Sequence, residues 1–205
     1  MVLDVGCGRA PYRGWFKRKA HFIGIDIKEG EGVDHIIDGR SPWPIGDESI
    51  DVVLCAQVME HAEDLQLVLD ETRRVLKNSG RVVVSFPFIY NEHGAPHDFR
   101  RFSINGARLL WPDWREVGTE RQGAIGSTLG ALWLNYCEAA LNRNIYTRLL
   151  KAALIPVWIL GCFFVNMGAV FLDLCDFTDR FYSNVLFVAQ KINPLENENA
   201  GKTSN

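Results

Sequence analysis

A loop in the middle of the chain gathers side chains that are able to do chemistry. The stretch FPFIYNEHGAPHDFRRFS, residues 86–103, carries two histidines, one aspartate and two arginines within nine residues. Histidine changes its protonation state near neutral pH, which suits it to general acid–base catalysis. We predict that His97 is a general base, with His93 behind it and Asp98 as the third catalytic side chain.

The same loop also suits substrate binding. A guanidinium group binds a carboxylate or a phosphate through two parallel hydrogen bonds, and an aromatic ring adds apolar contact area. We therefore predict that Tyr90, Arg100 and Arg101 contact the substrate.

Two other interpretations of this loop stay open. In the first, Asp98 and Arg101 form a structural brace and Ser103 caps the helix that follows; brace and active site have equal weight. In the second, His93, His97 and Asp98 bind a metal ion. Their spacing matches no defined metal site, so we predict no metal.

A glycine loop lies at the start of the chain, in LDVGCGRAPY, residues 3–12. Gly6 and Gly8 let the backbone approach a ligand closely, and Pro11 suits the first turn of a helix whose free N–H groups face that ligand. Asp26 follows about 20 residues later, where dinucleotide-binding folds place a ribose-binding carboxylate. A tight turn with a solvated Asp26 is the alternative. A nicotinamide cofactor favours a third glycine where Pro11 stands.

Five short apolar runs predict the strands that position these loops, and a helical pattern separates the last two. The runs are MVLDV, HFIGIDI, VDHIID, SIDVVLCA and GRVVVSFP, and the helical stretch is DLQLVLDETRRVLKNSG, residues 64–80. Buried strands separated by helices indicate a parallel sheet covered on both faces. We predict a doubly wound, Rossmann-like α/β fold with a mostly parallel sheet.

The second half of the chain has a different pattern. Ser103 precedes a short helix (INGARLLW), WREVGTERQ has strand character, and YSNVLFVAQKI is the last predicted strand. We expect a catalytic core over residues 1–123, a helical apolar insertion over 124–182, a final strand over 183–192 and a disordered tail over 193–205.

Composition narrows the class of protein. The chain has 205 residues, a net charge of −3, and 47% hydrophobic and 23% charged residues, which is ordinary for a folded domain and does not suggest a nucleic-acid partner. No CxxC pair is present, so we expect a reducing, cytoplasmic compartment. The five cysteines are Cys7, Cys55, Cys137, Cys162 and Cys175.

The order of the motifs resembles a known family. DVGCG, GID, IIDGRSPWPIGDESIDVVLCAQVMEH and ETRRVLKNSGRVVVSFP follow one another as in the class I S-adenosylmethionine-dependent methyltransferases of the type 11 branch. The resemblance covers residues 2 to about 104, and HDFRRFS resembles the stretch that many of these enzymes carry after the fifth strand.

The resemblance implies an S-adenosylmethionine site. Asp4, Gly6 and Gly8 would line the methionine end, Asp26 would bind the ribose hydroxyls and Asp38 the adenine amino group. Glu60 and His61 match the EH pair that the family often has, and we expect them to support the site; for His61, a hydrogen-bonded residue at a helix start has at least as much weight as a catalytic role. The full set of expected cofactor-binding residues is Asp4, Gly6, Cys7, Gly8, Asp26, Ile27, Asp38, Gly39, Gln57 and Val58.

The expected function is methyl transfer from S-adenosylmethionine to an oxygen or nitrogen of a small or lipid-linked molecule. An NAD(P)-dependent oxidoreductase and a catalytically inactive cofactor-binding module are the alternatives. Family members carry a helix before the first strand that helps to cover the cofactor. We expect the present chain to bind cofactor more weakly than a form extended at its N-terminus.

Residues 152–172, AALIPVWILGCFFVNMGAVFL, contain no charge. Their length suits a membrane span, but a single crossing would separate the last strand from its sheet. We therefore expect peripheral membrane contact, through an interfacial helix or a re-entrant hairpin broken near Gly161 to Gly168. A buried helix or a homodimer contact is the alternative.

Overall fold

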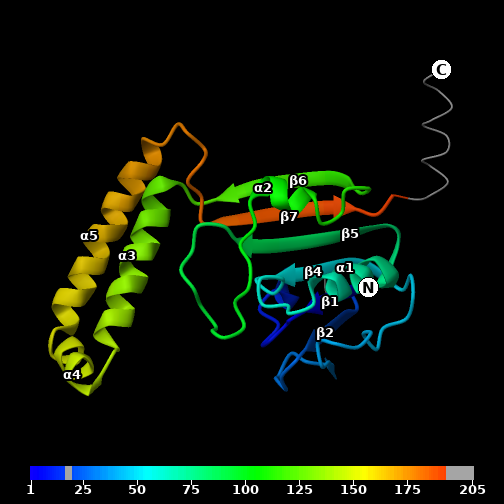
Figure 1. The fold of residues 1–205 in the computed structure, drawn as a ribbon, viewed down its shortest axis with the longest axis horizontal. Coiled ribbons are helices and arrows are strands. Elements are labelled where there is room, and N and C mark those ends of the chain that lie inside the picture. The colour runs from blue at the N-terminus through cyan, green and yellow to red at the C-terminus, as the bar shows by residue number, and fades with distance from the viewer. Residues whose placement is uncertain (17–19, 193–205) are drawn as a thin grey trace. The chain divides into compact units, whose positions relative to one another are not determined.

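The computed structural model describes residues 1–16 and 20–192, so the predicted tail, 193–205, lies outside the described residues. The chain forms two compact units (Figure 1). The sheet unit contains Met1–Phe86, Gly94–Glu120 and the segment from Leu186, and the helical unit contains Pro87–His93 and Arg121–Val185.

A seven-stranded sheet has the order β3-β2-β1-β4-β5-β7-β6. Its strands are β1 (Val2–Val5), β2 (Phe22–Asp26), β3 (His35–Ile36), β4 (Ile50–Ala56), β5 (Leu76–Pro87), β6 (Arg115–Gln122) and β7 (Asn184–Gln190). The first five are parallel to one another, with Leu3 of β1 opposite Ile23 of β2 and Val53 of β4. This mostly parallel order confirms the predicted fold class.

The last strand runs against the others. Near the start of β5, the N–H of Ser79 donates to the carbonyl of Lys191, and beyond the end of β5, the N–H of Phe88 donates to the carbonyl of Ser183. The beginning of β5 therefore pairs with the end of β7, which makes this pair antiparallel. The predicted final strand is confirmed, and it returns to the sheet after the helical segment.

Apolar side chains from the central strands form the core, as continuous hydrophobic runs predict for a parallel sheet. Leu3, Ile25, Val53, Val84 and Phe187 are all buried. With this sheet buried, the carboxyl ends of β1, β2 and β4 meet at one edge and bring their loops together there.

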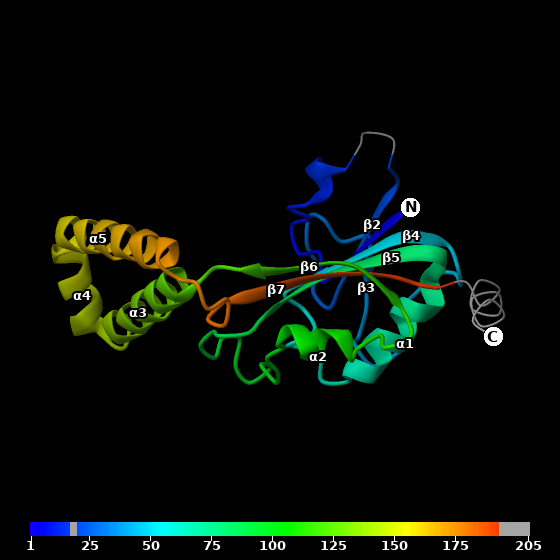
Figure 2. The ribbon, with the colours of Figure 1, turned by 90° about the horizontal axis from the view of Figure 1, so that it is seen from above.

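Helices α1 (Leu65–Val75) and α2 (Ile104–Arg108) lie on one side of the sheet, and the 3-10 turn η1 (Arg13–Trp15) lies on the other (Figure 2). Helix α1 ends earlier than its apolar pattern indicates. Leu76 adopts an extended conformation and pairs with Ile50, so the strand takes over where the helical pattern continues. The oxygen of Ser103 accepts from the N–H of Gly106, which confirms the predicted cap of α2.

The helix expected after the glycine loop is not found in the described residues before and after 17–19. The N–H of Ala10 donates to the carbonyl of Cys7, and Gly6, Gly8 and Ala10 all have positive φ angles. These left-handed residues keep the segment in turns and leave only η1. The prediction of helix N–H groups at this loop was wrong.

The helical unit contains α3 (Ile125–Leu141), α4 (Ile145–Ala153) and α5 (Ile155–Leu174). Helices α3 and α5 lie side by side, and α4 joins their far ends (Figures 1 and 2). Helix α5 is continuous, so the hairpin break expected near Gly161 to Gly168 was wrong; the reversal occurs at α4 instead. Among the described residues, α5 is the helix that is long and apolar enough to cross a membrane, and almost none of it is buried.

Candidate cofactor and active site

The glycine loop leaves β1 in a conformation that only glycine tolerates well. Gly6 has φ +69°, and a Cβ there would lie 2.4 Å from Cγ2 of Val58. Gly8 has φ +52°, with open space where a Cβ would be. The loop after β1 and the loop after β4 therefore touch at Gly6, which brings two predicted cofactor segments together.

Asp26, the last residue of β2, holds the loop from the other side. One carboxylate oxygen accepts from the N–H of Gly8 at 2.9 Å, and the other accepts from the N–H of Lys28 at 3.1 Å. The loops after β1 and β2 are thus joined through one carboxylate. Asp26 is half-buried and bonded to the backbone of both loops, a contact that suits a tight turn as well as a cofactor site.

Asp4 lies on β1 and is 2% exposed. Burial, and then the nearby charge of Asp26, raise the pKa of its carboxyl group to about 7. Its Oδ2 atom accepts no hydrogen bond from the described residues. A buried carboxyl group beside a second carboxylate, with an open acceptor, suits a ligand that carries positive charge.

Replacing Asp4 with asparagine is expected to stabilise the cofactor-free protein at about pH 8. Between about pH 4 and pH 7 the folded protein holds a proton that the unfolded chain has released, so the free energy of unfolding falls as the pH rises through this range. The variant loses this slope and should gain about 2 kcal/mol above pH 7. Urea titrations across this range measure both slopes, and equal slopes would contradict the buried, protonated Asp4.

Three other predicted residues follow the ends of β2 and β3. Gly39 has φ +70°, and a Cβ there would lie 3.8 Å from the side chain of Ile27, which is 63% exposed. Asp38 closes its own turn, because its carboxylate accepts from the N–H groups of Arg40 and Ser41 and from the Ser41 hydroxyl. These bonds lower the pKa of the Asp38 carboxyl group.

Cys7 and Gln57 enter the site by their backbones. The Cys7 thiol is buried and donates to the carbonyl of Gly32 at 3.3 Å, so the side chain is already bonded within the protein. Gln57 has φ +56° where β4 ends, and its N–H donates to the carbonyl of Ser85. The turn at Gln57 places Val58 against Gly6.

Two glycines for which the sequence predicts no role also shape the loop. A Cβ on Gly24 would lie 2.1 Å from the carbonyl oxygen of Gly32 and 2.7 Å from the Cys7 sulfur. A Cβ on Gly32 would lie 2.6 Å from that of Ala10. Gly24 lies within the second predicted strand. A glycine inside a strand often marks a close approach of two backbone segments, so its position could have predicted this role.

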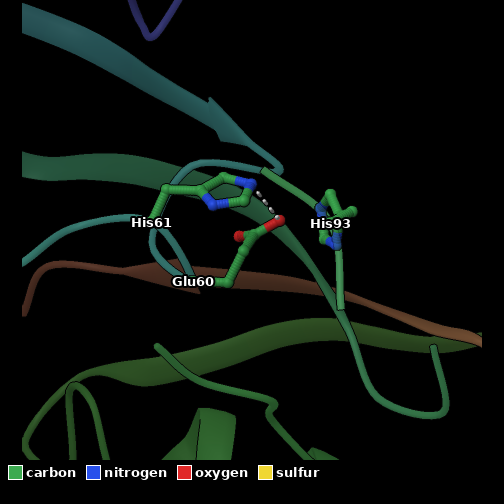
Figure 3. A group of neighbouring side chains, drawn as sticks. All are labelled: Glu60, His61 and His93. Carbon is green, nitrogen blue, oxygen red and sulfur yellow. Dashed lines mark ion pairs between the residues drawn. The ribbon is translucent and has the colours of Figure 1, made fainter. Parts of the chain in front are cut away.

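The segment after β4 holds the histidine-containing loop after β5. The N–H of Phe99 donates to the carbonyl of Glu60 at 2.9 Å, and Nδ1 of His61 lies 2.5 Å from the carbonyl oxygen of His97. Glu60 is fully buried, and Oε1 of its carboxylate lies 3.8 Å from Nε2 of His61, the pair joined by a dashed line in Figure 3. His61 therefore positions the backbone beside His97, a role that its sequence position alone did not reveal.

The arginines of the HDFRRFS stretch make structural contacts. Arg101 binds both oxygens of Asp98, at 2.5 and 2.7 Å, and the Asp98 side chain is 1% exposed. Arg100 donates to the carbonyls of Ala62 and Glu63. These contacts favour the brace interpretation for Asp98 and Arg101 over the expected contact with substrate.

The remaining predicted residues divide between the two units. His97 is exposed in the sheet unit, with its ring 6.2 Å from that of Phe99. Tyr90 and His93 belong to the helical unit, where their rings meet edge to face at 5.3 Å. His97 is therefore the one predicted catalytic histidine that lies on the unit that carries the glycine loop.

A family model described as a methyltransferase domain matches residues 3–84. Those residues contain β1, β2 and β4 and the loops that meet at Gly6 and Asp26. The match and the sheet order agree with each other. Over residues 3–84 the chain is similar to the methyltransferase domain family, in line with the class I S-adenosylmethionine-dependent methyltransferases that its motifs resemble.

Curated relatives match different shares of this chain, and the chain spans from less than half to about seven tenths of their lengths. An uncharacterized protein of Methanocaldococcus jannaschii is 32% identical over 40% of the chain, and the chain spans 42% of that protein's length. The ubiquinone biosynthesis O-methyltransferase of Pseudomonas aeruginosa is 28% identical over 66% of the chain and 71% of its own length. An uncharacterized methyltransferase of a Mycobacterium species is 30% identical over 64% of the chain and 56% of its own length.

Solved structures share the methyltransferase fold at low sequence identity. The [4+2]-cyclase SpnF matches 93% of this chain and 74% of its own, with 15% identity and a TM-score of 0.58. A Haemonchus contortus phosphoethanolamine N-methyltransferase in complex with S-adenosylmethionine matches 94% of this chain and 48% of its own, with 12% identity and a TM-score of 0.53. One neighbour is a cyclase, so the fold alone does not specify the reaction.

S-adenosylmethionine, the cofactor of this domain family, fits the side chains of the loop. Its sulfonium centre and amino group are cationic, which suits the buried Asp4 beside Asp26. It has no phosphate groups, which agrees with a loop that precedes a 3-10 turn instead of a helix N-terminus. When bound, it supplies an electrophilic methyl group.

Proposed function

We propose that this protein is an S-adenosylmethionine-dependent methyltransferase that acts on a small-molecule acceptor through oxygen or nitrogen. The observation that carries the proposal is the meeting of two carboxyl groups at the glycine loop, where Asp26 anchors Gly8 and the buried Asp4 keeps an open acceptor. A ligand with positive charge and a ribose uses both groups: the positive charge suits Asp4, and the ribose hydroxyls suit Asp26.

In this mechanism the protein mainly aligns the acceptor with the methyl carbon. Holding two reactants in line contributes up to about 7–11 kcal/mol to lowering a barrier. Asp4 and the loop backbone would hold the methionine end, and Asp26 the ribose. The loop that contains His97 follows β5 at the carboxyl edge of the sheet, where open α/β sheets bind ligands.

One alternative is disfavoured by the turn after the glycine loop, and the other is separated by a turnover measurement. A nicotinamide-dependent oxidoreductase needs a helix N-terminus for its pyrophosphate, and the segment after the glycine loop is a 3-10 turn. An inactive cofactor-binding module would keep the loop geometry but transfer no methyl group.

Cofactor binding and turnover separate these three functions. Calorimetric titration with S-adenosylmethionine and with NAD is expected to give binding of the first alone. Incubation with methyl-labelled cofactor and a panel of phenols, amines and lipid extract is expected to give a labelled product. Binding of NAD would refute the proposal, and cofactor binding without transfer to any acceptor would support the inactive module.

Replacing His97 with alanine is expected to lower kcat by about 10²–10⁴-fold for a hydroxyl acceptor, because a general base contributes about this factor. Cofactor affinity should stay unchanged, since the ring of His97 contacts Phe99 and not the glycine loop. The measurement is steady-state turnover with the cofactor Kd as control. Unchanged turnover would remove His97 from the mechanism.

The acceptor and the location of the protein form the finer part of the proposal. The exposed apolar surface of α5 supports contact with a membrane, and a membrane-bound enzyme suits a lipid-linked acceptor. The enzyme would act from the cytoplasmic side, where it finds its cofactor. A homodimer that covers α5 is the competing arrangement.

A further inference from the structure

Helices α3 and α5 pack closely against each other because small residues lie where they meet. A Cβ on Gly126 would lie 2.0 Å from the carbonyl oxygen of Ala169, and one on Gly130 would lie 3.3 Å from the Ala169 Cβ. Gly126 and Gly130 are four residues apart, which is the GxxxG spacing of helix pairs in lipid. Helix α5 therefore uses one narrow face for α3 and leaves the rest of its surface apolar and exposed.

The base of this pair is the end where α3 begins and α5 ends, and hydrogen bonds join the two helices there. The N–H of Ile125 donates to Asp176 at 3.0 Å, and the N–H of Ser127 donates to Asp173 at 2.9 Å. Two carboxylates thus satisfy free N–H groups at the start of α3, where the helix dipole favours negative charge. Strand β6 leads into the hairpin and β7 follows it, both at this base, and both strands belong to the sheet.

The exposed surface of the hairpin is almost entirely apolar. Its largest exposed side chains are Val157, Ile159, Leu160, Phe163, Phe164, Met167, Val170 and Phe171 on α5, and Ile145, Tyr146, Leu149 and Leu150 on α4. Within the apolar stretch of α5, the amide of Asn166 donates to the carbonyl of Cys162 at 2.7 Å, and the charged residue of this helix, Asp173, lies at its last turn. A surface of this extent indicates a permanent apolar partner.

The tip of the hairpin, where α4 joins α3 to α5, carries a net positive charge. The tip carries Arg143, Arg148 and Lys151 with one carboxylate, Glu138, which binds Lys151 at 2.5 Å, so the tip has a net charge of +2. Cations next to an apolar helix bind anionic lipid headgroups. A second copy of this chain would instead bring like charges together if the tips met.

Length alone would allow α5 to cross a bilayer, since 20 residues of helix extend about 30 Å. Three observations oppose a crossing. Carrying the tip across would move its cations to the far side, against the positive-inside rule. Trp133 and Tyr136, exposed in the middle of α3, belong at a membrane–water interface and not at its centre. Asn135, also in the middle of α3, donates to Asn91 of the loop after β5 at 2.8 Å, so a polar loop lies beside the middle of this helix.

We propose that the α3–α5 hairpin is a monotopic membrane anchor that lies in one leaflet of an anionic bilayer, with its base and its tip at the same surface. The proposal deepens the membrane contact suggested above and does not depend on methyl transfer. Lipid covers α5 and the apolar side of α4, while the cations of the tip meet headgroups.

Vesicle flotation tests the contact with lipid. The full chain is expected to float with vesicles of equal parts phosphatidylcholine and phosphatidylglycerol, and to bind pure phosphatidylcholine about tenfold more weakly. Phe164→Glu should reduce binding to the anionic vesicles by about a hundredfold, because its side chain is 63% exposed on α5. Leu109→Glu, at a side chain 75% exposed in the sheet unit, is the matched control and should bind as the parent does.

Thiol labelling tests the topology. In a Cys137→Ala, Cys162→Ala background, Cys175 reports on the base and an added Arg143→Cys, at an exposed polar position between α3 and α4, reports on the tip, since Cys7 and Cys55 are buried. A membrane-impermeant maleimide added outside sealed vesicles is expected to label both sites equally before and after detergent. A tip that is labelled only after detergent would overturn the monotopic arrangement in favour of a crossing.

A different set of results would show that lipid does not cover α5. A chain that stays off every vesicle and forms a dimer that Phe164→Glu dissociates would show that a second copy covers α5, and would overturn the proposal. Cofactor titration of each variant shows that it is folded. The same titration separates loss of membrane binding from failure of the methyltransferase function.

Discussion

Replacing Asp26 with alanine is expected to weaken binding of S-adenosylmethionine about 100-fold. The substitution removes the acceptor that holds the N–H of Gly8 and the carboxylate proposed to bind the ribose hydroxyls. A hydrogen bond to a charged group contributes about 1.5–3 kcal/mol, and a loss of about 2.7 kcal/mol corresponds to a factor of about 100 in Kd. Calorimetric titration measures the change directly.

Glu29→Ala is the control for this prediction. Glu29 is an exposed carboxylate three residues after Asp26, so its loss changes the net charge of the chain equally without touching the loop. Its Kd should remain within about twofold of the parent's, because solvent and salt screen exposed charges. An Asp26→Ala variant that binds as tightly as the Glu29→Ala variant would remove Asp26 from the cofactor site.

Replacing Arg101 with alanine is expected to lower the free energy of unfolding by about 3 kcal/mol. The substitution leaves the Asp98 carboxylate, which is 1% exposed, without its two-pronged partner. Removing one member of a buried ion pair costs about 3–5 kcal/mol, and the partial exposure of Arg101 places this pair near the lower end. Urea denaturation of the full chain measures the loss.

The Arg108–Glu116 pair provides a matched comparison on the same unit. Arg108 also binds a carboxylate through two nitrogens, but its side chain is 49% exposed and that of Glu116 is 37% exposed. Arg108→Ala should therefore cost less than about 1 kcal/mol. If Arg101→Ala also cost so little while kcat/KM fell strongly, Arg101 would bind substrate and the brace interpretation would be wrong.

The cofactor loop was the part of the site most open to prediction. Gly6, Gly8 and Asp26 act through local rules, because a strand, a glycine turn and a strand-terminal carboxylate constrain one another over short distances. The structure joins them as expected, through the contact of Gly8 with Asp26. What the spacing did not show was Gly32, whose missing side chain admits Ala10 from another turn.

The loop after β5 was harder to predict because its residue types suit two roles. Histidines, aspartates and arginines in one loop are compatible with catalysis and equally with bracing. Partners distant in sequence decide between these roles: the carbonyls of Ala62 and Glu63 take up Arg100, and His61 binds the carbonyl of His97. No local pattern encodes these contacts.

The sequence by itself determined the order of elements, the parallel sheet, the cofactor class of the domain and the charge-free stretch at 152–172. These properties depend on hydrophobic periodicity and short motifs, which act over a few neighbouring residues. Only the tertiary structure decided that Asp4 is buried beside Asp26, that Asp98 and Arg101 face each other in a buried pair, and that α5 folds back along α3. Burial and charge proximity depend on segments that meet across the fold, and only their packing fixes them.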